Sequence, residues 1–598
     1  MNCTEFLRSL ATVLILCWAS IAQSVSIDDE RLENLANEPT QWITFGRDLS
    51  QQRFSPLSQI NKHTIARLSP TWIFQTGEKA FYQINPIVAE GRLYTSLPSG
   101  GVTALNGANG EVIWSYRHKS KAASACCKDS NFGVSLAYGM VYSTTPEGNL
   151  LALDSKNGDL VWSSPLVDYK QSVTALEPTI ESETSHTLNM VSNISISMAP
   201  LVYQGRIYVG VTGKSDHKIT DTPIEVFPTT RRLINGFLVA FNAHTGRRLW
   251  TWNSNEIVNT GVANGRLETQ TPGKTLEKPT LSQSGSHDSK IGGGWIATTP
   301  SIDPSSDTIF FGTGKDFYDP TEEDLPDRRS FTNSLVALDS TTGDLRWHFK
   351  EVDRNLWGYD VSSPPLLFDW VSTSRTIKKA VAQASNTGWI YILDRNDGTL
   401  LARTQPFVPQ ENLFMEPKSK AVRISPGSAG AVSWSPLSFD PRTGDIFVTA
   451  THLPEIYIRE SRTTPHNQTT LTATRVLNEA AGRIASIDSS DGRIRWLVRT
   501  EQPIIGGSLA TSGDLIFVGH ADGHLTAYDS SNGKQLWSFL CGAGVNAPPI
   551  SFSINGEQFI AVAAGGDRKL HEYSGNSLIA FKLTEIPLVQ PGTDGEYR

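Results

Sequence analysis

Two adjacent cysteines, Cys126 and Cys127, have the spacing best suited to covalent chemistry in this 598-residue chain. Neighbouring thiols can close into a disulfide in an oxidising compartment, but the ring is small and strained, so it forms where a fold enforces it. Two ordinary buried thiols are the alternative. No Cys-x-x-Cys or Cys-x-x-Cys-His sequence occurs, which argues against a zinc knuckle and covalently attached haem. Four histidines lack ligand spacing and are predicted to be solvated surface groups: His63, His118, His520 and His524.

The N-terminus has the layout of a secretory signal peptide. A basic residue precedes a nearly continuous apolar stretch over residues 10–21, and small residues end at Ala22, which predicts a signal peptide over residues 1–22. A signal anchor is the alternative, but about 12 apolar residues are short for a bilayer span, and no membrane span is expected elsewhere. The mature chain, residues 23–598, is expected to be secreted or to lie in a secretory-pathway lumen, or in the periplasm of a bacterium. Two glycosylation sequons add weak support for a eukaryotic pathway: Asn193 and Asn467.

Composition places the chain among globular proteins that are rich in strands and turns. Its 48 Gly, 32 Pro and 15 Trp are typical of short strands joined by turns and packed by aromatic rings, and not of a helical bundle. The formal net charge of -8 offers no basic surface to a polyanion. Nucleic acid is therefore excluded as a partner.

An internal repeat organises most of the chain. It consists of a small residue, an apolar residue and Asp or Asn, followed by Gly after three further residues and by Trp after three more. The fifth copy has Ala402 at the tryptophan position. The seven copies begin at Ala104, Ala152, Ala240, Ala337, Ile392, Ser486 and Ala527.

Each copy of the repeat is predicted to form a β-hairpin. The Asp or Asn accepts backbone hydrogen bonds at the turn, the glycine provides a positive φ, and the tryptophan packs from an outer strand against the neighbouring sheet. A further strand pair precedes each copy, so about eight repeats of four strands predict an all-β, eight-bladed β-propeller. Trp72 fits an eighth closing strand whose partners come from the C-terminus.

The spacing between copies is uneven, which indicates insertions within one domain. We expect a single propeller over residues 23–598, with long polar loops at about 165–192, 214–234 and 253–290. Such loops usually carry function, so the active face is expected where they gather.

Motifs along nearly the whole mature chain resemble those of the quinoprotein alcohol dehydrogenases. This resemblance implies an eight-bladed propeller that holds pyrroloquinoline quinone (PQQ) in its central funnel and oxidises a small-molecule alcohol. It also implies an external electron acceptor, since no haem motif is present. The motifs are Trp42-Ile-Thr-Phe-Gly-Arg-Asp, Gln52-Arg-Phe-Ser-Pro-Leu-Ser-Gln-Ile, Ala125-Cys-Cys, Phe311-Gly-Thr-Gly, Trp357-Gly-Tyr-Asp, Gln383-Ala-Ser-Asn-Thr-Gly-Trp and Gly542-Ala-Gly-Val-Asn-Ala-Pro-Pro.

The resemblance also implies roles for individual residues. In such enzymes PQQ lies between an adjacent-cysteine disulfide ring and an indole, a calcium or lanthanide ion held by carboxylates and an amide polarises the quinone, and an aspartate acts as base. The matching catalytic positions are Asp360 and Lys315, and the matching metal ligands are Asp216 and Asp360. Cofactor-binding roles are implied for Cys126, Cys127, Gln83, Ser197, Thr212, Gly213, Trp295, Asn386 and Trp434.

Several of these positions depart from the family pattern. Lys315 stands in place of a metal-binding amide and Gly358 in place of the base, which leaves Asp360 as the acidic group of that segment. With Lys315 in the site, a salt bridge could hold an anionic cofactor in place of a metal bridge. Five further changes remove a carboxylate, two cations, a metal-binding glutamate and an amide, at Gln83, Phe132, Asn386, Ser215 and Ser433.

Two functions of different classes follow from these residues. The first is a quinoprotein-like oxidoreductase that oxidises an alcohol group with PQQ. The second is a propeller that has lost the redox cofactor and binds a ligand or guides a non-redox reaction such as a cyclisation, and the departures favour it. A blade-repeat scaffold resembling an outer-membrane assembly factor is a third, weaker hypothesis, because such proteins need no paired cysteines.

Overall fold

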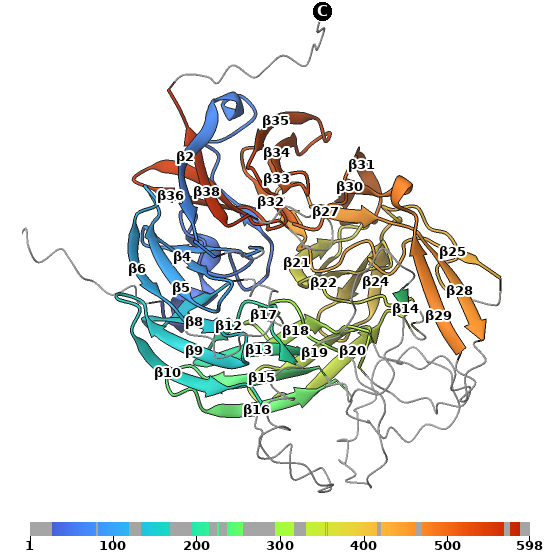
Figure 1. The fold of residues 1–598 in the computed structure, drawn as a ribbon, viewed down its shortest axis with the longest axis horizontal. Coiled ribbons are helices and arrows are strands. Elements are labelled where there is room, and N and C mark those ends of the chain that lie inside the picture. The colour runs from blue at the N-terminus through green and yellow to red at the C-terminus, as the bar shows by residue number, and fades with distance from the viewer. Residues whose placement is uncertain are drawn as a thin grey trace, which may run out of the picture.

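The strands of the protein form nine sheets in the part of the chain that the structure describes, and Figure 1 shows most of them arranged around a ring. The all-β propeller architecture predicted from the repeats is thereby confirmed. Helical segments in the same part of the chain are short: α2 (Asp29–Glu33) and the 3-10 turns η1 (Leu35–Asn37), η2 (Ile65–Arg67) and η3 (Leu477–Glu479). The structure is a computed structural model and describes residues 27–78, 82–118, 133–167, 194–213, 224–225, 236–254, 294–315, 331–352, 355, 357–415, 420–461, 469–566 and 575–585.

Some expectations from the sequence fall outside these ranges. They concern the signal peptide over residues 1–22, both sequons, most of the three insertions, and the site positions Cys126, Cys127, Phe132, Ser215 and Asp216. Within the second insertion, residues 224–225 form strand β14. No helix among the described residues has both the length and the apolar character needed to cross a membrane.

Strands pair antiparallel within each sheet of the first half of the chain. The first sheet contains β3 (Ile87–Ala89), β4 (Arg92–Ser96), β5 (Val102–Asn106) and β6 (Val112–Tyr116), and the second contains β7 (Ser135–Ala137), β8 (Met140–Thr144), β9 (Asn149–Asp154) and β10 (Leu160–Pro165). The third contains β11 (Ile194–Ser195), β12 (Leu201–Tyr203), β13 (Arg206–Gly213), β15 (Phe237–Asn242) and β16 (Arg248–Asn253), and the fourth contains β17 (Ser301–Asp303), β18 (Thr308–Gly312), β19 (Ser334–Asp339) and β20 (Leu345–Lys350).

The sheets of the second half continue the same order. They contain β21 (Leu366–Val371), β22 (Ile377–Ala384), β23 (Ile390–Asp394) and β24 (Leu400–Arg403), then β26 (Ser438–Asp440), β27 (Asp445–His452), β30 (Ala481–Asp488) and β31 (Ile494–Thr500). Next come β32 (Ser508–Thr511), β33 (Leu515–Gly519), β34 (His524–Asp529) and β35 (Gln535–Leu540), with β1 (Phe54–Ser55) parallel to β32.

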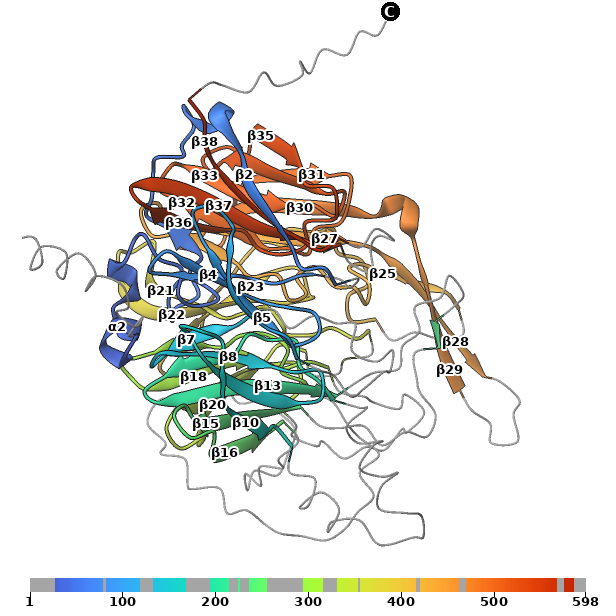
Figure 2. The same ribbon diagram turned by 60° about the vertical axis from the view of Figure 1, so that its left-hand side comes forward.

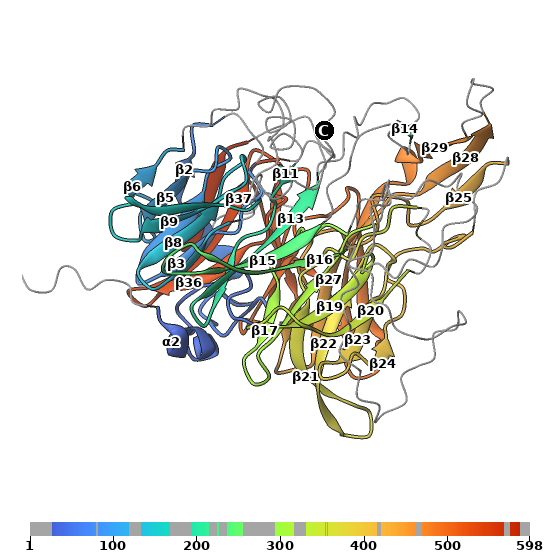
Figure 3. The same ribbon diagram turned by 90° about the horizontal axis from the view of Figure 1, so that it is seen from below.

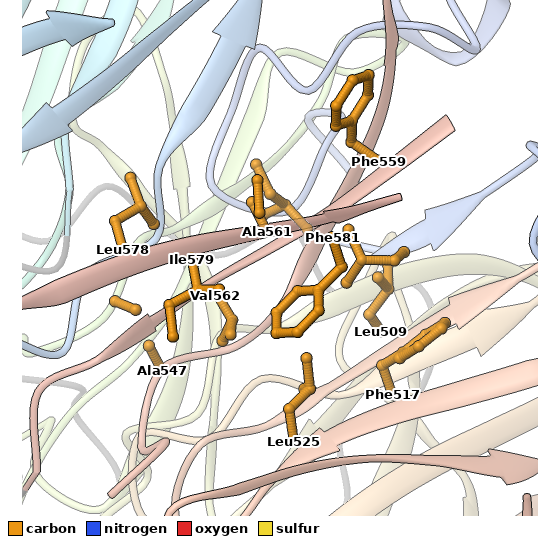
Figure 4. Close-up of a cluster of buried hydrophobic side chains, with 14 of the residues drawn as sticks. Leu509, Phe517, Leu525, Ala547, Phe559, Ala561, Val562, Leu578, Ile579 and Phe581 are labelled. Carbon is orange, nitrogen blue, oxygen red and sulfur yellow. The ribbon is translucent and has the colours of Figure 1, made fainter. Parts of the chain in front are cut away.

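The ring closes in a sheet that combines the two ends of the chain. β2 (Leu68–Gln75) pairs with β38 (Ser577–Leu583), which continues to β37 (Glu557–Ala564) and β36 (Ile550–Ile554). Trp72 lies on β2, so the predicted closing strand with C-terminal partners is confirmed. The side chains between this sheet and β32–β35 form a hydrophobic core (Figure 4), in which the rings of Phe581 and Trp537 meet edge to face with centroids 5.6 Å apart.

Each repeat turn carries the tryptophan of the preceding sheet. The Trp114 indole donates to the carbonyl of Ser155 at 3.1 Å, and a Cβ on Gly158 of the same turn would lie 2.5 Å from the Trp114 ring. The turn glycine therefore has two functions, since it has a φ of +79° and also leaves room for the indole. The same packing of a turn glycine against an indole ring recurs at Gly110, Gly246, Gly343, Gly398 and Gly533, each against a repeat tryptophan or Trp72.

The fifth copy of the repeat has Ala402 at the tryptophan position, and a tryptophan from another strand supplies the indole contact in its place. At the turn that follows it, the Trp370 indole of β21 donates to the carbonyl of Ser489 at 2.8 Å. A Cβ on Gly492 of that turn would meet the backbone of Thr404 at 2.8 Å, in place of an indole. The turn thus keeps an indole hydrogen bond although residue 402 is alanine.

A crossing segment, residues 40–55, ties the first strands of six sheets together. Its backbone carbonyls at Leu49, Ser50 and Gln52 each accept an amide of β17, β21 or β26 at 2.9 Å. Further backbone bonds join Thr40 to Ser553 of β36, Trp42 to Val88 of β3 and Arg53 to Ala510 of β32. The crossing segment therefore connects, by backbone hydrogen bonds, sheets that are distant in the sequence.

Arg53 anchors the crossing segment with a guanidinium that has no solvent exposure. Its donors reach three backbone carbonyls and one side-chain amide, those of Ser508 (3.1 Å), Phe45 (2.6 Å), Pro549 (2.6 Å) and Asn85 (3.0 Å). Burial lowers the pKa of Arg53 to about 9. A buried cation is stable here because neutral oxygens satisfy it from several sides.

The ninth sheet lies outside the repeat pattern. It is formed by β14 (Ile224–Glu225), β29 (Thr469–Arg475), β28 (Glu455–Ser461) and β25 (Val422–Ile424), and Figures 2 and 3 show it projecting on the side opposite α2. The projecting sheet joins segments about 250 residues apart in the chain, because Ile224 pairs with Ala473.

The prediction of solvated histidines is wrong for His520. Its side chain is buried at 7% exposure, and the hydroxyl of Tyr528 lies 3.1 Å from its Nε2. Burial lowers the pKa of His520 to about 4. His520 is thus a neutral core residue, which the turn-like sequence around it did not indicate.

Candidate functional site

Trp295 and Lys315 are brought together by a short backbone pairing next to β17 and β18. The amide of Gly314 donates to the carbonyl of Trp295 at 2.8 Å, and the amide of Gly294 donates to the carbonyl of Lys315 at 2.9 Å. The Lys315 ammonium lies 5.7 Å from the centroid of the indole, within cation–π range. A Cβ on Gly314 would lie 1.8 Å from the indole nitrogen. The ring therefore packs directly against the backbone that carries Lys315.

Asp360 reaches the same strand end from the segment that leads into β21. Its carboxylate oxygen Oδ1 accepts the backbone N–H of Lys315 at 2.6 Å. The amide of Val361 also donates to the carbonyl of Thr313 at 3.2 Å. We call Trp295, Lys315 and Asp360 the Lys315 cluster, and it joins residues that are up to 65 positions apart in the sequence.

Gly358 makes room for the Lys315 side chain. Its φ is +80°, and a Cβ on it would lie 2.8 Å from the lysine Nζ and 3.4 Å from the lysine Cδ. A residue with a side chain would therefore meet both a strained backbone and the ammonium. A glycine at 358 and a long cationic side chain at 315 fit together as a pair.

Asn386 supports the Asp360 backbone. Its own amide donates to the carbonyl of Asp360 at 3.2 Å. With the side-chain amide oriented to satisfy both of its groups, its oxygen accepts the Asp360 N–H at 3.1 Å and its nitrogen donates to the carbonyl of Val432 at 2.9 Å. At 2% exposure, Asn386 is placed to hold the segment that carries the carboxylate.

The other predicted cofactor-binding residues lie in neighbouring segments. The Ser197 hydroxyl donates to the carbonyl of Ala297 at 3.1 Å, two residues beyond Trp295. Thr212 and Gly213 end β13 and pair with β11, and Thr212 is 8% exposed. Gln83 is half-buried and donates to the carbonyl of Gly566 at 3.4 Å, and Trp434 packs with Phe45 and Ala199. Ser197 thus contacts the segment that carries Trp295, whereas Gln83 and Trp434 lie in the segments that precede β3 and β26.

Asn355 is a site residue that the sequence reasoning missed. Its Oδ1 accepts the amides of Gly358 (3.0 Å) and Tyr359 (2.9 Å), and its Nδ2 donates to the Tyr359 carbonyl (2.5 Å) and to Asn333 Oδ1 (2.8 Å). The amide of Asn333 in turn donates to the carbonyl of Gly314 at 3.0 Å. The two asparagines therefore join the turn before Asp360 to the strand end before Lys315. An asparagine three residues before a glycine is a common turn signal that could have identified Asn355.

Glu351 is a second residue that the sequence reasoning missed. It follows β20, its amide donates to the Asn333 carbonyl at 2.9 Å, and its side chain is 8% exposed. Neither carboxylate oxygen has a hydrogen-bond partner among the described residues. Burial raises the pKa of Glu351 to about 8, and the nearby Ser385 hydroxyl offsets part of that rise. The raised pKa favours the protonated form of this carboxyl group at neutral pH.

The described residues of the cluster do not fit a metal site. No group of three or more His, Cys, Asp or Glu side chains that could hold an ion occurs in the described ranges. Asp360 supplies one carboxylate, whose Oδ1 accepts a backbone N–H, and the neighbouring ammonium would repel a cation. Calcium and related ions require several oxygen ligands. An indole face beside an ammonium fits a planar, anionic organic molecule better.

Comparison with known families identifies the fold and its relatives. The family model of the PQQ glucose/ethanol/alcohol dehydrogenase β-propeller domain matches residues 42–411 and 470–560, which is more than half of the chain. The chain belongs to this dehydrogenase propeller family. The match includes Trp295, Lys315, Gly358 and Asp360.

Individual members of the dehydrogenase propeller family align over nearly the whole chain. Quinohemoprotein alcohol dehydrogenase ADH-IIG of Pseudomonas putida is 26% identical, over 95% of this chain and 79% of its own. Quinoprotein alcohol dehydrogenase PedE of Pseudomonas putida is 27% identical, over 94% of this chain and 90% of its own. Among solved structures, the Pseudomonas putida HK5 enzyme ADHIIG has a TM-score of 0.75 at 24% identity, over 96% of this chain and 85% of its own. A europium-containing methanol dehydrogenase has a TM-score of 0.74 at 22% identity, over 93% of this chain and 100% of its own.

Proposed function

We propose that the protein is a quinoprotein-type oxidoreductase that converts a small-molecule alcohol to a carbonyl compound. Membership of the dehydrogenase propeller family and relatives named as quinoprotein alcohol dehydrogenases support this function. The observation that carries it for this chain is the Lys315 cluster. It combines an indole face, a cation and a carboxylate within one strand end.

PQQ is the cofactor that fits this cluster. It is planar, so the Trp295 indole offers a surface for stacking, and it carries carboxylates, which the Lys315 ammonium can bind by charge-assisted hydrogen bonds. Ser197 and Thr212 are neighbouring hydroxyl donors in our proposal. Bound PQQ would supply the two-electron acceptor that alcohol oxidation requires, and an external carrier would reoxidise it.

The residues of this chain have separable tasks in the proposed reaction. The Asp360 carboxylate accepts the backbone N–H of Lys315, and in our proposal it would accept the proton of the substrate hydroxyl. Asn386 and Asn355 hold the backbone on either side of Asp360 and so orient it. Lys315 would balance the negative charge that develops when the hydroxyl loses its proton.

The architecture and location of the protein complete the proposal. We propose that eight of the nine sheets are blades and that the projecting sheet of β14, β29, β28 and β25 is an insertion. A signal peptide over residues 1–22, a disulfide between Cys126 and Cys127, and secretion remain predictions of the sequence.

A direct test is PQQ binding to the purified protein, followed by alcohol-dependent reduction of an electron-accepting dye. Quinone absorbance that persists after desalting and dye reduction that depends on an added alcohol would support the function. Asp360→Asn is expected to retain quinone and lose dye reduction, because it keeps the shape and removes the base. Equal dye reduction by Asp360→Asn would refute the proposed role of Asp360.

The second candidate function, a propeller without the redox cofactor, is favoured by Gly358. This residue offers no side chain where the related enzymes are expected to have a base, and Lys315 fills the space. The protein would then bind a ligand or guide a non-redox reaction. Failure to retain PQQ under any condition would favour this alternative.

A further inference from the structure

We infer that the Lys315 ammonium is the fixed cation of the site, and that it holds a quinone carrying carboxylates without a metal ion. This inference rests on the proposed function. It concerns a departure of this chain from the calcium- or lanthanide-dependent chemistry that the family resemblance implies. The geometry around Lys315 and Gly358 carries it.

The first step is that the ammonium has a defined position. The lysine side chain is confined on one side by Trp295, with Nζ 5.7 Å from the ring centroid. On another side it is confined by Gly358, where a Cβ would lie 2.8 Å from Nζ. The glycine therefore opens the space that the ammonium fills, and the indole attracts the charge.

The second step is that no described residue accepts a hydrogen bond from the ammonium, so its donors can serve a ligand. Among the described residues, Lys315 makes its hydrogen bond to Asp360 through the backbone N–H and not through Nζ. No ion pair of its ammonium occurs in the described part of the chain. An ammonium group has three N–H donors, and a carboxylate or carbonyl oxygen is the complementary partner.

The third step is that the cluster is unfavourable for a second cation. Asp360 is the one carboxylate whose contact with the cluster is established, and its Oδ1 accepts the Lys315 backbone N–H. Glu351, whose amide donates to Asn333, is buried, and burial raises its pKa to about 8, which favours its neutral form. The described residues thus contribute one ammonium and one carboxylate to the cluster, whereas a divalent or trivalent ion would need several oxygen ligands.

Equilibrium binding of PQQ to metal-free protein tests this inference without measuring catalysis. The purified full chain is treated with EDTA, and bound PQQ is followed by quenching of tryptophan fluorescence, with and without added calcium or lanthanum. We expect the same dissociation constant in all three conditions. Lys315→Met is expected to weaken binding about 10- to 100-fold, since it removes hydrogen bonds from a charged group.

Two further variants control for folding and for net charge. Lys315→Arg keeps the cation and is expected to retain most of the affinity. Lys534→Met removes the same charge from an exposed turn and is expected to bind PQQ as the parent protein does. Thermal unfolding of each variant shows whether it is folded.

The outcomes separate the inference from the proposed function. Binding that requires an added metal would overturn the inference and leave the dehydrogenase function intact. Unchanged metal-free binding by folded Lys315→Met would overturn the role of Lys315. Absence of PQQ binding by the folded parent protein in every condition would instead remove the proposed function itself.

Discussion

Replacement of Glu351 by glutamine is expected to make the protein more stable at alkaline pH. Glutamine has the same shape and is neutral at every pH, so it mimics the protonated carboxyl group. Burial raises the Glu351 pKa from 4.5 to about 8. Below pH 4.5 the carboxyl is protonated in the folded and unfolded states, and above it the unfolded chain releases a proton that the folded chain retains. The free energy of unfolding of the parent protein therefore falls as the pH rises from 4.5 to about 8.

The size of this effect follows from the shift. A change from 4.5 to about 8 corresponds to about 5 kcal/mol as an upper value. For a chain of this length, this is a difference of about 4 °C in melting temperature. Glu351→Gln and the parent should melt together near pH 4.5, and the variant should melt about 4 °C higher above pH 8.

Differential scanning fluorimetry between pH 4.5 and 9 measures this difference. Glu557→Gln is the control, since Glu557 is 54% exposed and pairs with Lys582 at the surface. Its melting temperature should follow that of the parent within about 1 °C, as is usual for an isolated surface ion pair. A constant offset between Glu351→Gln and the parent over the whole pH range would refute the reasoning, because it would mean that Glu351 does not titrate between its two states.

The remaining predictions concern the frame and the turn before Asp360. Gly158→Ala should lower the free energy of unfolding, measured by urea titration, by about 2–4 kcal/mol, because its Cβ would overlap the Trp114 ring at a φ of +79°. Gly139→Ala is the control, since Gly139 has a φ of +73° but open space around it, and it should lower the free energy of unfolding by about 1–2 kcal/mol. Equal losses in the two variants would contradict the role of Gly158 in packing against Trp114. Arg53→Met should cost about 3–5 kcal/mol, because several buried oxygens lose their donor, so an unchanged urea midpoint would exclude that role. Asn355→Ala should weaken PQQ binding about tenfold or more, because the amides of Gly358 and Tyr359 lose their acceptor. Asn355→Asp keeps this acceptor and should bind PQQ more tightly than Asn355→Ala. Equal affinities of the two variants would show that the turn before Asp360 is ordered without these two hydrogen bonds.

The frame of the molecule could be predicted from the sequence because its signals are local and repeated. The repeat places an acidic or amide residue, a glycine and a tryptophan at fixed distances, so each copy reports the same hairpin. The closing strand at Trp72 could be predicted because it has the tryptophan without the turn. The compensation by Trp370 could not, since that indole comes from a different strand and reaches a turn that is 119 positions away.

The site could be predicted only in part, because its contacts are non-local. Lys315 and Asp360 were chosen through the family resemblance, and the backbone hydrogen bond between them spans 45 positions. Gly358 was recognised as a lost base, whereas its packing against the lysine is a property of the folded chain. Asn355 and Glu351 were missed because asparagine and glutamate are ordinary surface residues, and their significance comes from burial.

The division between frame and site explains how this chain can change its chemistry without losing its fold. The repeat signals and their tryptophan contacts lie in the turns between the last two strands of each sheet, as at Trp114 and Gly158. The Lys315 cluster lies instead in segments that lead into β17 and β21 and follow β18. Substitution at residue 315 or 358 changes none of the repeat contacts, so the stability of the ring sets no strong limit on which cation or carboxylate occupies the site. The fold and the cofactor requirement can therefore diverge independently, and for this reason the metal-free binding measurement is informative although the family is known.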